Sequence, residues 1–265
     1  MRRAVASSAG QDYGLNYMPK PVAYIANHLR QVLVNGASAP HTAEVQRFFK
    51  DEISSRGWYT DELRKLARRF TKVIKGDAGV EYLVAVADSL FHGKVLEEKI
   101  LAVQLLETSV RELGPKHFDV FEGWLERVST WADHDALVSY LIGPMLVADR
   151  KLAPRALRWA QSSDRWHRRA AAVAFIRGVR EKQFENEIRQ VANALLEDED
   201  DMVRKGLGWL LREAAKYHPE FAVPLLMKIR DRAPRLVLRT ACETLPVKTK
   251  TEIMGKPPRK RVVRA

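Results

Sequence analysis

The sequence predicts an all-α protein in which antiparallel helix pairs of the HEAT type stack into a curved α-solenoid, as a single domain. Apolar residues recur at helical spacing through most of the 265 residues, and no run of alternating β-branched residues competes with that pattern. Glycine and proline fall mainly between the periodic segments. Predicted helices of about 10–19 residues recur in pairs every 35–45 residues or so, a period typical of solenoids. No crisp motif repeats, so an irregular helical bundle is the alternative.

Taken in order, the predicted helices are joined by short connections, so neighbours along the chain should pack antiparallel. Leu96, Ile100 and Val103 begin a stripe at spacings of four and three residues, as an amphipathic helix requires. Prolines fall at several first turns, where a missing N–H costs least, whereas Gly143-Pro144 is expected to break or kink a helix. The predicted helices cover residues 21–34, 42–53, 60–75, 79–91, 95–112, 115–128, 131–149, 153–162, 165–180, 183–196, 201–217 and 219–231, with a short one over 234–244.

The two ends of the chain are expected to be disordered arms on either side of a helical-repeat domain over residues 21–245. Residues 1–20 show no periodicity, and residues 246–265 carry seven basic residues around Pro257-Pro258. The two ends hold eight of the twelve net positive charges, which leaves +4 on residues 21–245. A positive excess favours a polyanionic partner. A nucleic-acid assignment therefore depends on where the basic residues of the folded part lie.

Composition excludes several classes of protein and site. One cysteine, Cys242, rules out a disulfide framework and a cysteine-based metal cage. The seven histidines lack paired metal-ligand spacing, and no phosphate-binding glycine loop occurs, so neither a metal nor a cofactor is expected. No apolar run is long enough to span a membrane, and no secretory signal opens the chain. The expected protein is cytoplasmic.

The segment around Trp131 is the first of three candidate sites centred on tryptophan. Thr130 followed by Asp133 resembles a capping box, so a helix should begin at Trp131. Trp131 and Asp135 then lie one turn apart on one face. There an aromatic ring can pack against a sugar or base while a carboxylate stabilises developing positive charge. The alternative is a core tryptophan beside a solvated carboxylate in the first turn of a helix.

The second candidate site follows Trp166, at the start of a helix whose later residues are nearly all apolar. Arg168 and Arg169 sit at the edge of this central element, so either one is a candidate for contact with a phosphate. A solvated helix end, or an ion pair with a neighbouring helix, is an equally good interpretation.

The third candidate site combines Lys205, Trp209 and Arg212, whose spacings of four and three residues place a tryptophan between two cations on one helix face. Packing explains a tryptophan on the basic face poorly, although cation–π pairing on an exposed face is the alternative. Gly206 and Gly208 each cost a helix about 1 kcal/mol relative to alanine. They also allow a ligand or a neighbouring helix to approach closely.

In this order, the segments resemble the DNA alkylation repair family, the AlkD-like DNA glycosylases, which are built of HEAT-like helical repeats. The resemblance runs from about residue 42 to residue 245 and rests on the order and spacing of the segments rather than on one motif. The segments are Phe48-Phe49-Lys50, Asp61-Glu-Leu-Arg64-Lys-Leu-Ala67, Trp131-x-x-x-Asp135, Trp166-x-Arg168-Arg169 and Lys205-x-x-Gly208-Trp209-x-Leu211-Arg212-Glu213.

The resemblance implies a glycosylase that removes N3- and N7-alkylated purines from duplex DNA. Such a protein is expected to act as a monomer in the bacterial cytoplasm or nucleoid. The resemblance makes Asp135 the catalytic carboxylate, and Trp131 and Trp209 the aromatic residues that flank the deoxyribose of the lesion. A purine alkylated at N3 or N7 carries a positive charge and leaves without being protonated. The enzyme then has to stabilise an oxocarbenium-like sugar and to position a water.

The resemblance also implies residues that bind the DNA. Either Arg168 or Arg169 would contact a phosphate, and Arg212 would make a further DNA contact beside Lys205. Where the family can present a tyrosine to the DNA, this chain offers Phe48 or Phe49, and that position is left open.

Two other functions compete with the glycosylase: a helical-repeat module that binds nucleic acid without turnover, and a protein scaffold with tryptophans as interface anchors. Convergence of the candidate residues on one concave surface would favour the enzyme. A salt bridge that held Asp135 away from the tryptophans would argue against it.

Overall fold

The computed structural model describes residues 20–255, and this part of the chain is built of helices without a strand, which confirms the predicted all-α solenoid. Residues 1–19 and 256–265, which include most of the two expected arms, lie outside the described residues. No helix of the described part is long and apolar enough to cross a membrane. The α-helices are α1 (Val22–Asn35), α2 (Ala39–Gln46), α3 (Thr60–Phe91), α4 (Leu96–Glu107), α5 (Pro115–Leu125), α6 (Trp131–Leu137), α7 (Gly143–Ala148), α8 (Ala153–Arg158), α9 (Arg165–Val173), α10 (Ile176–Val179), α11 (Glu185–Leu195), α12 (Asp201–Tyr217), α13 (Pro219–Ile229), α14 (Arg235–Ala241) and α15 (Val247–Met254).

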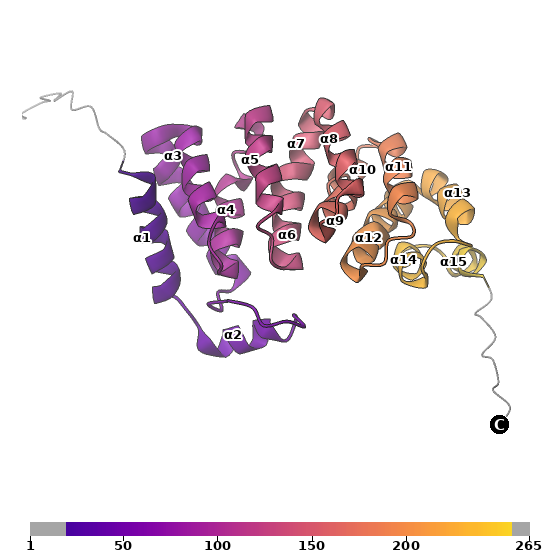
Figure 1. Ribbon diagram of the computed structural model, residues 1–265, viewed down its shortest axis with the longest axis horizontal. Coiled ribbons are helices and arrows are strands. Elements are labelled where there is room, and N and C mark those ends of the chain that lie inside the picture. The colour runs from indigo at the N-terminus through magenta and orange to yellow at the C-terminus, as the bar shows by residue number, and fades with distance from the viewer. Residues whose placement is uncertain (1–19, 256–265) are drawn as a thin grey trace, which may run out of the picture.

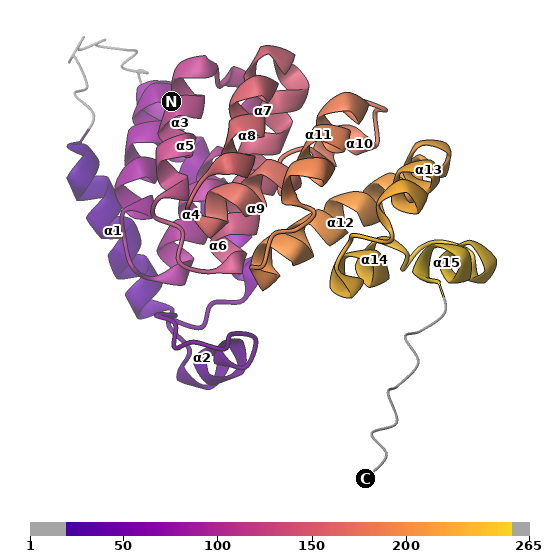
Figure 2. The same cartoon turned by 45° about the vertical axis from the view of Figure 1, so that its right-hand side comes forward.

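The helices stand in a curved row that runs from α1 to α15 (Figures 1 and 2). We call α4, α6–α7, α9–α10, α12 and α14 the inner helices, because each of them contacts the next. The helices α5, α8, α11 and α13 alternate with them along the chain and return it to the same edge. The inner helices therefore run in one direction, and their N-terminal ends lie together. In the core, Trp124 is fully buried and its ring stacks on that of Phe91, with the ring centres 4.2 Å apart.

The helix predicted over residues 42–53 is wrong in its second half, because α2 ends at Gln46 and residues 47–59 form a loop with little regular structure. The amide of Gln46 donates to the carbonyl oxygen of Asp51 at 2.9 Å and accepts from the backbone N–H of Ile53 at 3.0 Å. These bonds fold the chain back on the end of α2. The 47–59 loop lies below α4 and α6 in Figure 1, near the N-terminal ends of the inner helices.

Two other boundaries differ from the prediction. The helices expected over 60–75 and 79–91 are joined in α3, with a break at Gly79, whose φ of 80° lies in the left-handed region that glycine adopts readily. Gly143-Pro144 does not break the expected helix over 131–149. A π-helical turn over Val138–Ile142 precedes the proline and accommodates its missing N–H, so α6 and α7 continue one another.

The expected disordered tail over residues 246–265 is wrong for its first part, because α15 occupies Val247–Met254. Ile253 is buried against the core. Arg230 donates to the carbonyl oxygen of Glu252 at 2.8 Å, and Arg235 donates to that of Met254. The basic composition of this segment hides a short helix that one apolar side chain and two arginines attach to the last repeat.

Three consecutive charged residues at the start of α4 are buried: Glu97, Glu98 and Lys99. Each of them binds a different neighbouring element near the N-terminal ends of the inner helices. Glu97 accepts from the backbone N–H groups of Arg56 and Gly57, both at 2.9 Å, and so anchors the 47–59 loop. Glu98 pairs with Arg30 on α1 at 3.2 Å.

Lys99 points toward the start of α6. Its Nζ lies 3.2 Å from the carboxylate of Asp133, and neither side chain is more than 4% exposed. Asp133 also accepts from the backbone N–H groups of Ser129 and Thr130, at 2.9 and 2.7 Å. The predicted capping box is confirmed, and a buried ion pair holds it in place.

Replacing Lys99 with methionine should lower the free energy of unfolding by about 3 kcal/mol, because it leaves the carboxylate of Asp133 buried without its cation. Urea denaturation would measure the loss. The matched control is Lys94→Met, two residues before α4. This lysine is exposed and forms no ion pair within residues 20–255, so it should tolerate the change within about 0.5 kcal/mol. Equal stability of the two variants would show that the buried pair does not hold α6.

Candidate functional site

Trp131 and Asp135 lie one turn apart on α6, as the sequence predicts. The hydroxyl oxygen of Thr130 accepts from the backbone N–H groups of Ala132 and Asp133, so the helix begins at Trp131. The Trp131 side chain is exposed (37%), which sets it apart from the fully buried Trp124. Asp135 retains 20% of its side-chain exposure. The indole ring of Trp131 and the carboxylate of Asp135 therefore both keep some exposed surface near the start of this helix.

The carboxylate of Asp135 is held by two neighbours. Arg169 on α9 binds it in a bidentate manner, with Nε 3.0 Å from Oδ1 and Nη2 2.7 Å from Oδ2. The Nδ1 atom of His134 lies 2.7 Å from the same Oδ1. A carboxylate offers about four acceptor positions, two on each oxygen. Oδ1 is fully occupied, and Oδ2 keeps one position for a ligand or a water.

The protonation states of Asp135 and His134 follow from burial and from this contact. Burial by itself raises the pKa of Asp135, but hydrogen bonds from His134 and Arg169 outweigh it and hold that pKa below its usual value. Burial also lowers the pKa of His134, against the opposing effect of the carboxylate. At neutral pH Asp135 is therefore ionised and His134 is neutral. Both ring nitrogens of His134 face acceptors, because Nε2 lies 3.1 Å from the carbonyl oxygen of Trp166. A neutral ring donates to only one of them, and we assign its hydrogen to Nδ1, which makes the shorter contact and donates to the carboxylate.

Arg169 connects three inner helices. Besides Asp135 on α6, its guanidinium binds the carbonyl oxygen of Met202 on α12 at 2.6 Å. Gly206, one turn further along α12, faces the same side chain, and a Cβ at that position would lie 3.1 Å from Cγ of Arg169. The close approach that the sequence predicts at Gly206 is thus made by Arg169. At Gly208 the close neighbour is Thr240 of α14, because a Cβ built at Gly208 would lie 2.9 Å from the Cβ of Thr240.

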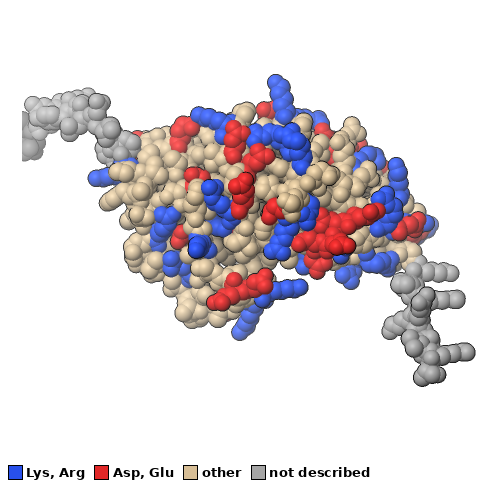
Figure 3. Space-filling model, in the orientation of Figure 1, with Lys and Arg blue, Asp and Glu red and all other residues tan. Residues whose placement is uncertain are grey.

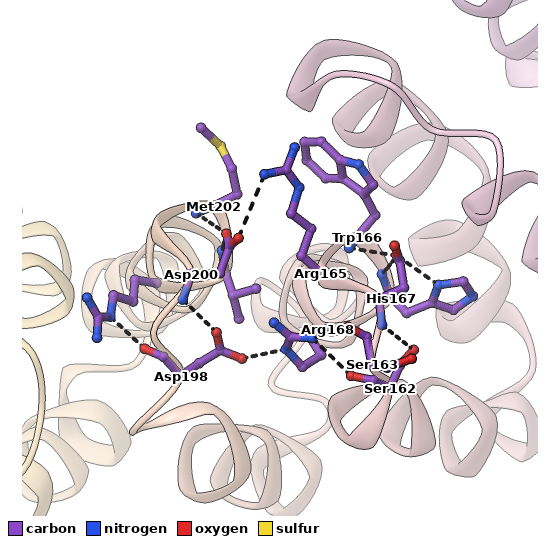
Figure 4. A network of polar contacts seen from close by, with 12 residues as sticks. Ser162, Ser163, Arg165, Trp166, His167, Arg168, Asp198, Asp200 and Met202 are labelled. Carbon is purple, nitrogen blue, oxygen red and sulfur yellow. Dashed lines mark hydrogen bonds and ion pairs between the residues drawn. The ribbon is translucent and has the colours of Figure 1, made fainter. Parts of the chain in front are cut away.

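The structure separates the two arginines that the sequence leaves as alternatives. Arg168 binds the carboxylate of Asp198 at 2.6 Å, together with the carbonyl oxygens of Ser162 and Ser163 (Figure 4). Arg169 is buried against Asp135. Both arginines thus make internal contacts, as the ion-pair interpretation of this segment predicts.

A cavity of about 680 Å³ lies between the N-terminal ends of α6, α9 and α12 and the 47–59 loop. Trp131 and Arg169 line it, and the ring of Phe49 stacks on Trp131 at 5.2 Å. Phe48 lies on its rim with 74% of its surface exposed. Phe49 thus packs against the candidate site, and Phe48 faces solvent.

The charge of this first cavity is mixed. Lys50, Lys94 and Lys205 line it, are exposed and make no ion pair with any described residue. Four carboxylates also line it: those of Asp51, Glu52, Asp200 and Asp201. The face of the molecule in Figure 3 likewise mixes basic and acidic side chains and shows no continuous basic surface. Free lysines at particular positions, rather than the overall charge, provide the cations for a ligand.

Trp209 lies in a second cavity of about 650 Å³, which is lined by the π-helical turn before α7, by α10 and by the second half of α12. Tyr140 and Arg212 also line it. Trp209 is half-buried and packs against the core, so packing explains part of its position on the basic face. Arg212 pairs with Glu213 and Glu243, each at 3.1 Å.

The candidate residues thus share one layer but not one cavity. Trp131 and Lys205 line the first cavity, Trp209 and Arg212 line the second, and Asp135 lines neither. Asp135 is in a salt bridge, yet on the same helix face as Trp131 and not remote from it.

The sequence gives weak signals for several other residues of the site. His134 is adjacent to Asp135 in the chain, and adjacent residues of a helix do not normally face each other. Tyr140 lines the second cavity, and Arg64 lies 5.8 Å from its ring centre. Lys99 has one usable signal, because it belongs to a charged triplet at the start of an otherwise largely apolar helix. Among the described residues, no three His, Cys, Asp or Glu side chains gather to hold a metal ion.

Acid should destabilise the protein in two stages. The lowered pKa of His134 means that the unfolded chain takes up the proton first, so stability falls as the pH drops below 6.5. The lowered pKa of Asp135 adds a loss below about 3.8. Urea denaturation of wild type and His134→Gln between pH 7 and pH 5 tests the first stage. The variant should lose less stability, by a slope of at most about 1.4 kcal/mol per pH unit. Parallel curves would contradict the lowered pKa.

Comparison with known proteins points to one family. The family model described as DNA alkylation repair enzyme matches residues 29–245. A solved structure, a predicted DNA alkylation repair enzyme from Enterococcus faecalis, superposes with a TM-score of 0.72 at 17% sequence identity, over 80% of this chain and 97% of that one. At this identity the likeness shows the shared fold. No curated protein matches by sequence. Because the family model covers most of the chain, the protein belongs to the DNA alkylation repair enzyme family.

Proposed function

We propose that this protein is a DNA glycosylase that hydrolyses the N-glycosidic bond of cationic N3- or N7-alkylated purines in duplex DNA, as a step of base excision repair. Membership of the family implies an enzyme with DNA as its partner. The observation that carries the specific chemistry is Asp135, an oriented and ionised carboxylate with one free acceptor position, one turn from the exposed Trp131.

The charge state of Asp135 selects the substrate class. With a pKa below the usual range, this carboxyl group has no proton to give to a leaving base at neutral pH. A purine alkylated at N3 or N7 needs none, since its own positive charge is neutralised when the bond electrons pass to the base. The bond between C1′ and the purine nitrogen breaks, and the positive charge moves to the sugar.

Oδ2 of Asp135 is the atom that acts on this sugar. Its free acceptor position can face the oxocarbenium-like carbon or accept a hydrogen bond from the attacking water. Water oxygen bonds to C1′, and the proton it loses passes to the carboxylate or to solvent. Arg169 and His134 act as positioning residues, because they fix the plane of the carboxylate. The positive charge of Arg169 repels the sugar cation and so offsets part of the attraction by the carboxylate. The pair therefore stabilises the sugar cation only if Oδ2 lies nearer to the sugar than the guanidinium does.

The aromatic residues and the free cations bind the DNA around the lesion. Trp209 and the face of Trp131 that Phe49 does not cover offer π surfaces to a cationic sugar. The two tryptophans lie in the two cavities that the same inner helices carry. Lys205 is free to meet a phosphate, and Arg212 does so if it exchanges Glu243 for the DNA. Of Arg168 and Arg169, the structure supports neither as a ready phosphate contact, since both have internal partners. The protein acts as a monomer in this proposal.

Asp135→Asn should reduce the release of 7-methylguanine or 3-methyladenine from methylated duplex DNA by about 10²–10³-fold, because it removes the charge that stabilises the sugar cation. Single-turnover release of the free base would measure the effect. Circular dichroism and the melting temperature must show that the variant is folded, since it also weakens the contact with Arg169. Base release equal to that of wild type would rule out the assigned role.

The two tryptophans should contribute through their rings. Trp131→Leu and Trp209→Leu are each expected to slow base release about tenfold, since a cation–π contact is worth about 1–2 kcal/mol when desolvated. Trp131→Phe and Trp209→Phe keep an aromatic face and should retain most of the rate. If the leucine and phenylalanine variants behave alike, the rings do not act on the sugar.

A nucleic-acid-binding module without turnover is the alternative, and the same preparation separates the two. It predicts salt-dependent binding of duplex DNA, seen as tryptophan quenching, with no base released from any methylated substrate. No quenching by duplex DNA at low salt would instead favour a protein scaffold.

A further inference from the structure

A third cavity, of about 460 Å³, lies outside the two that carry the candidate catalytic residues. It is bounded by the first half of α3 and by the turn that follows α4, and its lining contains no acidic side chain. The lining residues are Arg68, Thr71, Lys72, Lys75, Gly76, Thr108 and Ser109.

Three cations form one side of this cavity. Arg68, Lys72 and Lys75 follow each other at spacings of four and three residues, so they share a face of α3. Lys75 pairs with Glu112. Arg68 and Lys72 are exposed and have no ion pair or hydrogen bond with any described residue. Like charges one turn apart destabilise a helix, and no contact within the described part of the fold offsets their repulsion. A bound anion would.

Ser109 provides an independent sign of a missing partner. It is 1% exposed, and its hydroxyl group has no hydrogen-bond partner among the described residues. A buried hydroxyl without a partner is costly, and it is most easily satisfied by an acceptor that enters the cavity. The neighbouring Gly76 leaves the approach open, because a Cβ built there would meet nothing within 4 Å.

The turn after α4 places this cavity next to the candidate site. Glu107 and Val110 line the second cavity, which also contains Trp209, and the two residues between them, Thr108 and Ser109, line the third. A polyanion that occupies the second cavity and continues toward the N-terminal repeats therefore meets Arg68 and Lys72 next.

We propose that Arg68, Lys72 and Ser109 form a phosphate subsite that holds the DNA backbone on one side of the lesion. This inference rests on the proposed function only for the presence of duplex DNA in the second cavity. The guanidinium of Arg68 and the ammonium of Lys72 neutralise one or two phosphates, and the hydroxyl of Ser109 donates to a phosphate oxygen. Such contacts fix the register of the protein on the duplex and carry no base specificity.

The test compares two double variants of α3 with the same change in charge. Arg68→Gln/Lys72→Gln removes the cations of the cavity, whereas Lys65→Gln/Arg69→Gln removes two exposed cations of the same helix that do not line it. Fluorescence anisotropy on an unmodified duplex of about 20 base pairs gives Kd at several salt concentrations. The cavity variant should bind at least tenfold more weakly at low salt, and the slope of log K against log salt should fall by about 2. The control variant should stay within about threefold of wild type.

Two outcomes would overturn the subsite: equal Kd values and slopes for the two double variants, or a larger loss for the control. Ser109→Ala tests the hydroxyl separately and should weaken binding about threefold; unchanged binding would remove Ser109 from the subsite. Because the duplex carries no lesion, the result does not depend on base release. A loss of affinity confined to the cavity variant, together with no base release by wild type, would support the subsite and contradict the glycosylase.

Discussion

The contact between Arg169 and Asp135 is the interaction on which the candidate site depends. It joins α9 to α6, and the third nitrogen of the same guanidinium joins α9 to α12 through Met202. A bidentate contact fixes the plane of a carboxylate as well as its position. Both charges lose water on burial, and the bonds from His134 and to Met202 compensate for that loss. The orientation of Asp135 therefore depends on the spacing of α6, α9 and α12, since the same guanidinium contacts all three helices.

The basic residues divide into two groups by what they contact. Arginines such as Arg168 and Arg169 hold helices together, because a planar guanidinium can bind several acceptors on neighbouring turns. The lysines that line the first cavity, among them Lys50 and Lys205, are exposed and form no ion pair within the described part of the chain. Net charge is therefore a poor guide to where this protein would bind a polyanion. In the proposed function, the ionised Asp135 suits a substrate that carries its own positive charge.

Local patterns predicted the elements of this fold better than the contacts between them. The helix over 201–217 agrees with α12 at both ends, because Asp200 caps it and Pro219 follows it. The 47–59 loop and α15 were missed, since Gln46 and Ile253 act through contacts that no periodicity reveals. The sequence pattern predicted the candidate residues of the site, such as Trp131 and Asp135. Their partners were not predicted, because His134 and Met202 reach the site through side-chain direction and a backbone carbonyl.

The sequence by itself determined the all-α solenoid, the start of α6 and the position of Trp131 above Asp135, since helical spacing and capping depend on residues only a few positions apart. Only the tertiary structure decided that Arg169 rather than Arg168 holds Asp135, and that Trp131 and Trp209 lie in separate cavities. Adjacent residues on a helix point about 100° apart. Which of two neighbouring arginines meets a carboxylate 34 positions away therefore depends on how the helices pack.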